Sequence, residues 1–543
     1  MRADRLFRLS FVVAAFMTLT VSPTAGVTSQ GNSPQMPPGQ EKKEMRVLRP
    51  VSHAVSKALR DLDRFERQPE FEAPEPGKTA PSKPPAGGGN GNNDPVLQTI
   101  YPSSAAPAVL RTFGGITWTG SVPPDTNLAV GDTQVMEIVN SMFVIYDKAG
   151  GLLAGPSSLK SVFAPLGTSD PCASYGGGDP VVVYDRLANR WVTTHYTFTP
   201  NYMCIGVSQT SDATGAYNLY SYSFGPNTAD YAKFGVWSDG YYMSANTFSP
   251  TDSFLGGQAC AFDRAAMIAG ALSPAVVCFQ SAGSWASLLP ADLDSTTAPP
   301  AGAPNYFVNL GNGNALNLYK FHADFATPAN STFTGPTTIT VAKFDQGCYS
   351  CIPQPGTKEQ LESLASRLMF RLSYQRFAGY ESLLVNHAVQ IVQNSNTKTQ
   401  TGIRWYEIRN PGGTPVVAQQ STFSPDTTTY RWMGSIAQDK QGNMFLGYSA
   451  SSSTLFPSIR YTGRLATDPL NQMQSEKTLI TGLGNQILSP QNTSGRDRWG
   501  DYATVALDPV DSCTFWFATE YLTFSGYNNW ATHLVSAKFA GCS

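Results

Sequence analysis

The chain has 543 residues, a formal net charge of −2 and eight cysteines. A charge balance so close to neutral argues against a nucleic-acid binder that works through a basic surface. Charged residues are concentrated in the first 100 positions and become scarce afterwards, where Gly, Ser, Thr, Tyr and Asn are frequent. This composition is typical of an extracellular all-β protein.

The first 26 residues predict a secretory signal peptide. Arg2, Arg5 and Arg8 precede a mostly apolar stretch at 10–21, and small residues follow it. The stretch is too short for a stable membrane anchor, and no later segment reaches 18 consecutive apolar residues. We therefore expect a secreted or periplasmic protein without a transmembrane segment.

Residues 27–99 form a low-complexity N-terminal segment rich in Pro, Gly and polar residues. Within it, apolar residues at three- and four-residue steps predict an amphipathic helix over 46–68. A poorly ordered exported N-terminus is the alternative interpretation. The sequence leaves open whether this segment is removed or docks on the rest of the chain. The apolar positions are Val47, Leu48, Val51, Val55, Leu59, Leu62 and Phe65.

Residues 100–543 predict an all-β, seven-bladed β-propeller. Short runs of Val, Ile, Tyr, Phe and Thr alternate with Gly, Asn, Asp and Pro turns. Asp125, Asp179 and Lys233 are 54 residues apart, and Arg371, Arg431 and Arg498 follow at steps of 60 and 67. About 50 residues make one four-stranded blade. Two β-sandwiches in tandem are the alternative architecture. The predicted blades start near 125, 178, 232, 304, 369, 430 and 497.

The cysteines predict disulfides, because an even number in an exported chain favours pairing over free thiols. Pairing by proximity in the sequence gives four bridges. Sequence alone allows 105 connectivities, so proximity is the only guide. The expected pairs are Cys172–Cys204, Cys260–Cys278, Cys348–Cys351 and Cys513–Cys542.

Two rings of polar residues follow from the blade alignment. The first lies where each blade's inner strand begins, and the second lies one strand later. A slip of one residue turns a side chain to the other face of its sheet, so the assignment depends on the register. The first ring holds Asp125, Asp179, Lys233, Arg371, Arg431 and Arg498, with Asn305 near it. The second ring holds His195, Asn246, His322, His387, Tyr448 and Glu520.

If both rings face one channel mouth, they form a site for an anionic ligand such as an acidic sugar. Guanidinium groups bind carboxylate or sulfate in a bidentate manner. His387 and Glu520 then serve as catalytic acid and base, and Tyr448 as a proton donor or nucleophile. The remaining residues of the substrate site are Arg371, Arg431, Arg498, Asp179, Lys233, Asn246 and His195, with Asp426 and Asp501 near the cluster in sequence.

A structural interpretation of these residues stands beside the functional one. An Arg at a blade entry also suits bonds to the next blade, and His195 also suits a hydrogen-bonded histidine inside a sheet. Asp, Asn and Gly turns are compatible with structural calcium, but no stretch has the EF-hand spacing. We therefore assign no cofactor and no metal ligands, and we expect a monomer.

Several motifs resemble a group of secreted bacterial proteins that are predicted propellers, mostly without assigned function. These motifs are RWMGSIAQDKQGNMFLGYSASSS at 431–453, PSIRYTGR at 457–464, RWGDYATVALDPVDSCTFWFATEY at 498–521, CIPQPGT at 351–357 and ESLLVNHAV at 381–389.

The chain is more distantly similar to sialidase-like propellers. That similarity implies an arginine triad, for which Arg371, Arg431 and Arg498 are the candidates. The chain departs from those proteins because it lacks a clean Ser-x-Asp-x-Gly-x-x-Trp box.

Two hypotheses of function result. In the first, the propeller acts on an anionic glycan at one channel mouth, as a hydrolase or a polysaccharide lyase. In the second, it is a non-catalytic extracellular or envelope binding propeller. Whether the protein is an enzyme stays open at this point, because fold analogy does not transfer chemistry.

Overall fold

The computed structural model describes residues 44–65 and 94–543, except 103, 105, 199, 282, 393–398, 488–497 and 528. The described residues belong to one compact unit. The predicted signal peptide and most of the low-complexity segment lie outside the described residues.

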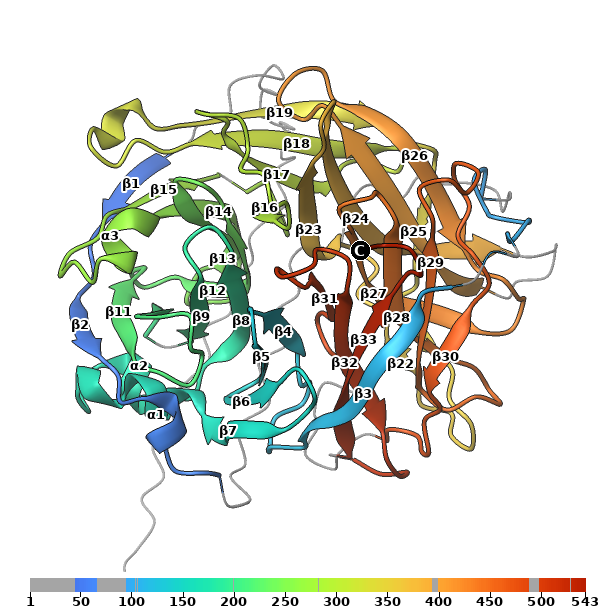
Figure 1. Ribbon diagram of the computed structural model, residues 1–543, viewed down its shortest axis with the longest axis horizontal. Coiled ribbons are helices and arrows are strands. Elements are labelled where there is room, and N and C mark those ends of the chain that lie inside the picture. The colour runs from blue at the N-terminus through green and yellow to red at the C-terminus, as the bar shows by residue number, and fades with distance from the viewer. Residues whose placement is uncertain are drawn as a thin grey trace, which may run out of the picture. The chain divides into compact units, whose positions relative to one another are not determined.

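The described chain is built from antiparallel sheets whose strands follow one another in sequence (Figure 1). Three four-stranded sheets are β4-β5-β6-β7, β27-β28-β29-β30 and β31-β32-β33-β3. Their strands are β4 (Asn127–Val130), β5 (Gln134–Val139), β6 (Met142–Asp147), β7 (Leu152–Ser158), β27 (Tyr430–Gln438), β28 (Met444–Ser451), β29 (Ser458–Arg464), β30 (Lys477–Ile480), β31 (Thr504–Leu507), β32 (Phe515–Leu522), β33 (Trp530–Lys538) and β3 (Ala108–Thr117).

Two further sheets have five strands, in the orders β8-β9-β10-β11-β2 and β12-β13-β14-β15-β1. Their outermost strands come from the N-terminal segment. The strands are β8 (Gly178–Asp185), β9 (Arg190–Thr197), β10 (Tyr202–Ser208), β11 (Tyr217–Ser223), β2 (Ser52–Val55), β12 (Thr228–Val236), β13 (Gly240–Phe248), β14 (Phe254–Asp263), β15 (Val276–Gln280) and β1 (Glu44–Leu48).

The largest sheet runs β19-β18-β17-β16-β23-β24-β25-β26, and β20 pairs with β24. It joins two four-stranded antiparallel units through the parallel pair β16–β23. The strands are β16 (Leu289–Leu293), β17 (Asn305–Leu310), β18 (Ala315–His322), β19 (Thr332–Thr340), β20 (Asp345–Gln346), β23 (Met369–Arg376), β24 (Glu381–Val392), β25 (Thr399–Arg409) and β26 (Val416–Phe423).

The remaining elements are short and lie between the sheets. A two-stranded sheet pairs β21 with β22. None of the helices in the described ranges is long and apolar enough to cross a membrane. These elements are β21 (Ser350–Ile352), β22 (Leu361–Glu362), η1 (Leu59–Asp61), α1 (Leu159–Phe163), η2 (Ala164–Leu166), α2 (Pro171–Ser174), α3 (Arg264–Ile268) and η3 (Pro328–Asn330).

The first strands of these units contact one another in a closed ring, which makes the fold a β-propeller. The contacts run from β4 to β8, β12, β16, β23, β27 and β31, and from β31 back to β4. Strand β3 precedes all of them in the chain yet completes the last sheet beside β33 (Figure 1). The count of seven blades stays a prediction, because the units that begin with β16 and β23 share one sheet.

The predicted helix over 46–68 is wrong for the described residues. Strands β1 and β2 and the turn η1 take its place, and residues 66–68 lie outside the described part. Pro50 interrupts any helix that passes through it, and Val47, Val51 and Val55 are β-branched and prefer strands. The segment pairs with the outer edges of two blades, β1 with β15 and β2 with β11.

All four expected disulfides are confirmed. Cys172–Cys204, Cys260–Cys278, Cys348–Cys351 and Cys513–Cys542 are bonded, and the chain has no free cysteine. Disulfides persist in oxidising compartments. The pairing therefore indicates a non-cytoplasmic protein.

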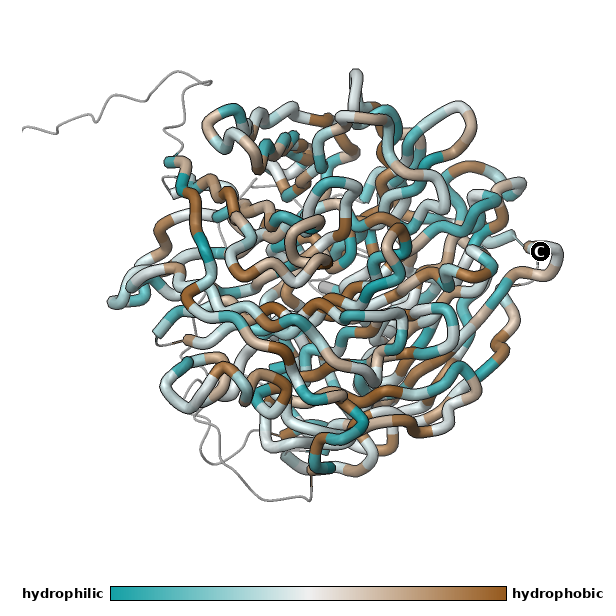
Figure 2. Tube along the Cα trace, turned by 60° about the vertical axis from the view of Figure 1, so that its left-hand side comes forward, coloured by the Kyte–Doolittle hydropathy of each residue, from teal (hydrophilic) through white to brown (hydrophobic). Residues whose placement is uncertain are grey.

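The core lies between neighbouring blades. Hydrophobic and hydrophilic residues alternate in short stretches along the trace (Figure 2), as strands with one face toward a neighbour require. Trp432 and Trp499, the tryptophans of the two matching Arg-Trp dipeptides, are fully buried with ring centroids 5.5 Å apart. The shared dipeptide thus reflects packing between the β27 and β31 blades.

A bulge recurs where inner strands begin, and it corrects the alignment made from spacing alone. The register shifts between Gly178 and Val181 in β8 and between Asp230 and Lys233 in β12. Inside these bulges, Asp179 and Tyr231 have positive φ values of 44° and 56°. Tyr231, two residues before Lys233, is therefore the counterpart of Asp179. Bulges re-aim side chains in this way.

Candidate functional site

Three buried carboxylates converge where β4, β8 and β31 begin. Asp125, Asp179 and Asp501 each place a carboxylate oxygen within 4.8 Å of the others. They are 1%, 2% and 7% exposed. We call these three residues, together with Lys233, the entry cluster. Residues far apart in the sequence meet here because the ring of inner strands closes between β31 and β4.

Backbone and amide hydrogen bonds fix the carboxylates. Asn140 donates from Nδ2 to Asp125 at 2.8 Å and accepts from the backbone N–H of Asp179 at 3.1 Å. The backbone N–H of Asp501 donates to Asp125 at 2.6 Å. The Tyr502 hydroxyl donates to the carbonyl of Pro180 at 2.9 Å. The cluster is thus rigidly built from the β4, β8 and β31 blades.

Lys233 is buried between two aromatic rings. Its Nζ lies 3.7 Å from the ring centroid of Tyr231 and 4.0 Å from that of Tyr502, and it donates to the carbonyl of Ala232 at 3.0 Å. Burial lowers the pKa of Lys233, and Asp179 is the largest opposing influence. Burial also raises the pKa of Asp179 to about 7, although Lys233 opposes that shift.

Arg498 and Glu520 border the entry cluster. Arg498 forms ion pairs with Glu362, at 2.7 Å, and with Asp501. Glu520 accepts from the backbone N–H of Gly500 at 2.6 Å. Burial raises the pKa of Glu520 to about 8. Its carboxyl is therefore largely protonated near neutral pH.

Arg371 lies in a separate group that we call the Arg371 cluster. Its guanidinium bonds Asp292 at 2.5 Å, Asp294, and the carbonyl of Val505 at 3.0 Å. Asp292 lies on β16, Asp294 directly follows that strand and Val505 lies on β31, so Arg371 connects three inner strands. A cavity of about 20 Å³ lies beside Arg371 and is lined also by Arg186. That volume is large enough for about one water molecule.

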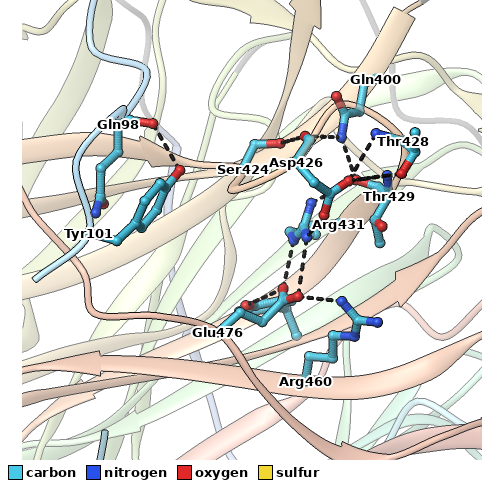
Figure 3. Close-up of polar contacts among 11 residues, drawn as sticks. Gln98, Tyr101, Gln400, Ser424, Asp426, Thr428, Thr429, Arg431, Arg460 and Glu476 are labelled. Atoms are coloured by element: carbon cyan, nitrogen blue, oxygen red, sulfur yellow. Dashed lines mark hydrogen bonds and ion pairs between the residues drawn. The ribbon is translucent and has the colours of Figure 1, made fainter. Parts of the chain in front are cut away.

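Arg431 lies in a third group, the Arg431 cluster, formed with Asp426, Glu476, Arg460 and Tyr448 (Figure 3). Its fully buried guanidinium bonds Glu476 at 2.7 Å, Asp426 at 2.5 Å and the carbonyl of Thr429 at 2.8 Å. Burial opposes the ionisation of Glu476, yet bonds from Arg431 outweigh it and lower the pKa of that carboxyl.

The predicted catalytic residues do not meet. Tyr448 donates to Glu476 at 2.8 Å in the Arg431 cluster, and Glu520 borders the entry cluster. His387 is buried on β24, bonded to the Tyr406 hydroxyl at 3.0 Å and stacked on that ring. Burial lowers the pKa of His387 to about 3. It therefore stays neutral at ordinary pH and packs inside its blade.

Two further second-ring residues, His195 and Asn246, are also buried inside blades, whereas His322 is exposed at the end of β18. His195 is 1% exposed and meets Phe163 edge-on at 4.9 Å, and burial lowers its pKa to about 3. Asn246 accepts from the backbone N–H of Ser287 at 2.7 Å. Both side chains therefore pack against neighbouring groups of the protein.

The structure thus brings Asp125, Asp179, Lys233 and Arg498 together and places Arg371 and Arg431 in other clusters. Each of the three arginines pairs with its own carboxylates, so the geometry does not support a single arginine triad. Sequence reasoning missed Tyr231 and Tyr502, and it noted Asp501 without placing it in a ring. A signal was present, since Asp-Tyr-Ala occurs at 230–232 and again at 501–503.

An open groove lies at the outer edge of the β23 blade, and one of its lining residues, Gln98, is bonded to Tyr101 next to the Arg431 cluster (Figure 3). It has a volume of about 500 Å³, within the range of small-ligand sites. We call it the rim groove. Uncharged residues line it on three segments: Val96, Leu97, Gln98, Thr99 and Ile100; Val417, Ala418, Gln419, Gln420 and Ser421; and Leu470, Asn471 and Gln472.

No protein-family model matches the chain, and no curated protein matches it in sequence. Its structural neighbours include a protein of unknown function from Dyadobacter fermentans, with 10% identity over 82% of this chain and 100% of that chain and a TM-score of 0.26. An alpha-L-arabinofuranosidase from Lactobacillus brevis has 10% identity over 67% and 94%, with a TM-score of 0.27.

A neuraminidase-like protein from A/little yellow-shouldered bat has 10% identity over 57% of this chain and 95% of that chain, with a TM-score of 0.24. At these TM-scores the comparisons carry no argument about the activity of this chain.

Proposed function

We propose that this protein is an exported binding propeller that holds an uncharged segment of a glycan in the rim groove. The observation that carries the proposal is the groove itself, which is open, about 500 Å³ in volume and lined by amide, hydroxyl and apolar side chains without a charged residue. Such groups donate to and accept from sugar hydroxyls.

The floor of the rim groove is fixed by internal hydrogen bonds. Gln98 donates to the carbonyl of Met473 at 2.6 Å and accepts from its N–H at 2.9 Å. Gln419 donates to Glu407 at 2.6 Å. A floor held in this way loses little conformational entropy when a ligand binds.

Other polar groups of the rim groove remain available to a ligand. The Oε1 atom of Gln420 accepts from Ala342, and the Oδ1 atom of Asn471 accepts from Gln420, both at 2.8 Å. These bonds hold each side chain by its oxygen and leave its NH₂ group as a donor. Gln472 and Thr99 add an amide and a hydroxyl at the same wall.

A second candidate function is glycan cleavage at the entry cluster. The observation that favours it is the meeting of three carboxyls at one point, together with burial that raises the pKa of Asp179 to about 7. Glycoside hydrolysis uses one protonated and one ionised carboxyl. Burial of these side chains from solvent is the argument against it.

The test is binding of the purified full chain to a panel of neutral and acidic oligosaccharides, followed by calorimetry on the best ligand. We expect neutral glycans to bind and the double variant Asn471→Ala, Gln472→Ala to lose at least about tenfold in affinity, or about 1.4 kcal/mol. Thr337→Ala, an exposed substitution on the outer strand β19, is the matched control and should bind normally.

Binding that survives the double variant, or that is confined to acidic glycans, contradicts the rim groove proposal. The same oligosaccharides are then followed for new reducing ends and for the ultraviolet absorbance of unsaturated products. Cleavage that disappears in Asp179→Asn would establish the second candidate function.

A further inference from the structure

The entry cluster has properties that ion pairing alone does not explain. Three carboxylates meet within 4.8 Å of one another while almost wholly buried. Like charges at that distance repel strongly in a medium of low dielectric constant. A buried carboxylate is normally paired or bound to a metal ion.

A second observation points to a missing ligand at Asp179. Its Oδ2 atom is buried and has no hydrogen-bond partner among the described residues, although the residue is only 2% exposed. Leaving a buried acceptor unsatisfied costs about 1–3 kcal/mol, and more when the group is charged. A cation beside Oδ2 removes that cost.

The nearby cations have other partners. The ammonium group of Lys233 donates to the Ala232 carbonyl and lies over the rings of Tyr231 and Tyr502. Arg498 pairs with Glu362 as well as with Asp501. Neither residue forms an ion pair with Asp179 in the described part of the chain.

We propose that Asp125, Asp179 and Asp501 form a calcium-binding site that joins the β4, β8 and β31 blades where the propeller ring closes. All three supply hard carboxylate oxygens, which Ca²⁺ prefers. Oxygens on opposite sides of a Ca²⁺ ion lie about 4.6–5.2 Å apart, twice its bond length of about 2.3–2.6 Å. The carboxylate oxygens lie within that span.

The site differs from a loop-type calcium site in what it connects. Asp125 and Asp501 are 376 residues apart in sequence, and a hydrogen bond from the backbone of Asp501 to Asp125 already joins them. Asn140 holds both Asp125 and Asp179 from the β4 blade. The ion therefore binds to a site that is largely organised before it arrives, and its binding energy stabilises ring closure.

The experiment is a Ca²⁺ titration of the full chain after dialysis against EDTA, followed by thermal unfolding. We expect saturable binding by calorimetry and a rise in Tm of about 2–5 °C at a Ca²⁺ concentration near 100 times Kd. Tb³⁺ is a second probe. Tyr231 and Tyr502, whose rings contact Lys233 of the entry cluster, should sensitise its luminescence, and Ca²⁺ should displace it.

Asp179→Asn and Asp501→Asn are the test variants, and both should lose Tb³⁺ luminescence and the Ca²⁺-dependent rise in Tm. Asp179→Asn should retain its Tm in EDTA, because it removes a repelling charge. Glu137→Gln, which alters a fully buried carboxyl elsewhere in the β4 blade, is the matched control and should respond to Ca²⁺ as wild type does.

Three outcomes would overturn the proposal. The first is a folded wild type without saturable binding of either ion. The second is unchanged Ca²⁺ affinity in both Asp variants. The third is an Asp179→Asn protein that loses several degrees of Tm in EDTA, since that result assigns the carboxylate to an internal ion pair. None of these readouts depends on glycan binding at the rim groove.

Discussion

The Arg431 cluster and the entry cluster are both buried groups of charged residues at the start of inner strands, but their charges are balanced differently. In the Arg431 cluster each carboxylate lies beside a guanidinium, with Glu476 held by both Arg431 and Arg460 (Figure 3). In the entry cluster three carboxylates face one another, Arg498 pairs with Asp501 at the border, and Lys233 contacts tyrosine rings and a carbonyl.

The difference separates structural charge from charge that is available to a ligand. A buried ion pair that is complete leaves nothing for a ligand to bind, whereas an incomplete set of carboxylates attracts a cation. Position at a blade entry is common to both clusters. The balance of partners, and not position along the strand, therefore identifies the candidate site.

The largest effect is expected for Arg431→Ala. This change leaves Asp426 and Glu476 without their shared guanidinium, and breaking a buried pair costs about 3–5 kcal/mol. Denaturant unfolding monitored by tryptophan fluorescence measures the loss of stability. Arg60→Ala is the control, since Arg60 and Asp212 have side chains 53% and 41% exposed, and exposed pairs contribute about 0–1 kcal/mol.

A different result for Arg431→Ala would change the interpretation of its cluster. If the variant keeps its stability but loses affinity for an anionic glycan, Arg431 is a ligand-binding residue and the contrast between the two clusters disappears.

The second effect concerns Glu137, a buried carboxyl that belongs to neither cluster. It is 0% exposed and accepts from the backbone N–H of Ile116 at 3.1 Å. Burial raises its pKa to about 8 from the ordinary value of 4.5. The folded protein therefore binds this proton more tightly than the unfolded chain does.

The contribution of Glu137 to the free energy of unfolding therefore depends on pH. The contribution of Glu137 to stability is present below about pH 4.5 and is lost as the pH rises through about 8, by at most about 5 kcal/mol. Glu137→Gln cannot ionise, so its stability relative to wild type should increase across that range. Unfolding of both proteins at several pH values checks this. Parallel curves would show that Glu137 is not buried as a neutral acid.

The sequence predicted the fold class and the disulfides because both depend on local information. Strand–turn alternation requires only neighbouring residues, and each bonded cysteine pair is close in sequence, as Cys348 and Cys351 illustrate. The N-terminal segment was mispredicted for a related reason. Its apolar spacing fits a helix, but the outer edges of β11 and β15 select strands, which a local pattern cannot reveal.

The candidate site was predicted only in part, because register and pairing are not local. The entry bulge shifts the alignment by two residues, so Lys233 was assigned to the position that Tyr231 occupies. Pairing partners lie far away in the chain, as Glu362 does from Arg498. Charged residues at equivalent positions of a predicted repeat therefore do not by themselves define a functional site.

The smallest effect is expected for Lys233→Met. This variant tests most directly whether the entry cluster and the Arg431 cluster differ in how their charges are balanced. Methionine has a similar length and packs against the rings of Tyr231 and Tyr502, whereas the positive charge is lost. If the three aspartates bind Ca²⁺, removing a neighbouring positive charge should tighten Ca²⁺ binding by about tenfold, or about 1.4 kcal/mol. Calorimetry on the EDTA-treated variant measures the change. If Lys233 is instead the counter-ion that completes the cluster, the variant will lose stability without Ca²⁺. The entry cluster would then resemble the Arg431 cluster, because the positive charge of Lys233 would neutralise the aspartates without a direct ion pair.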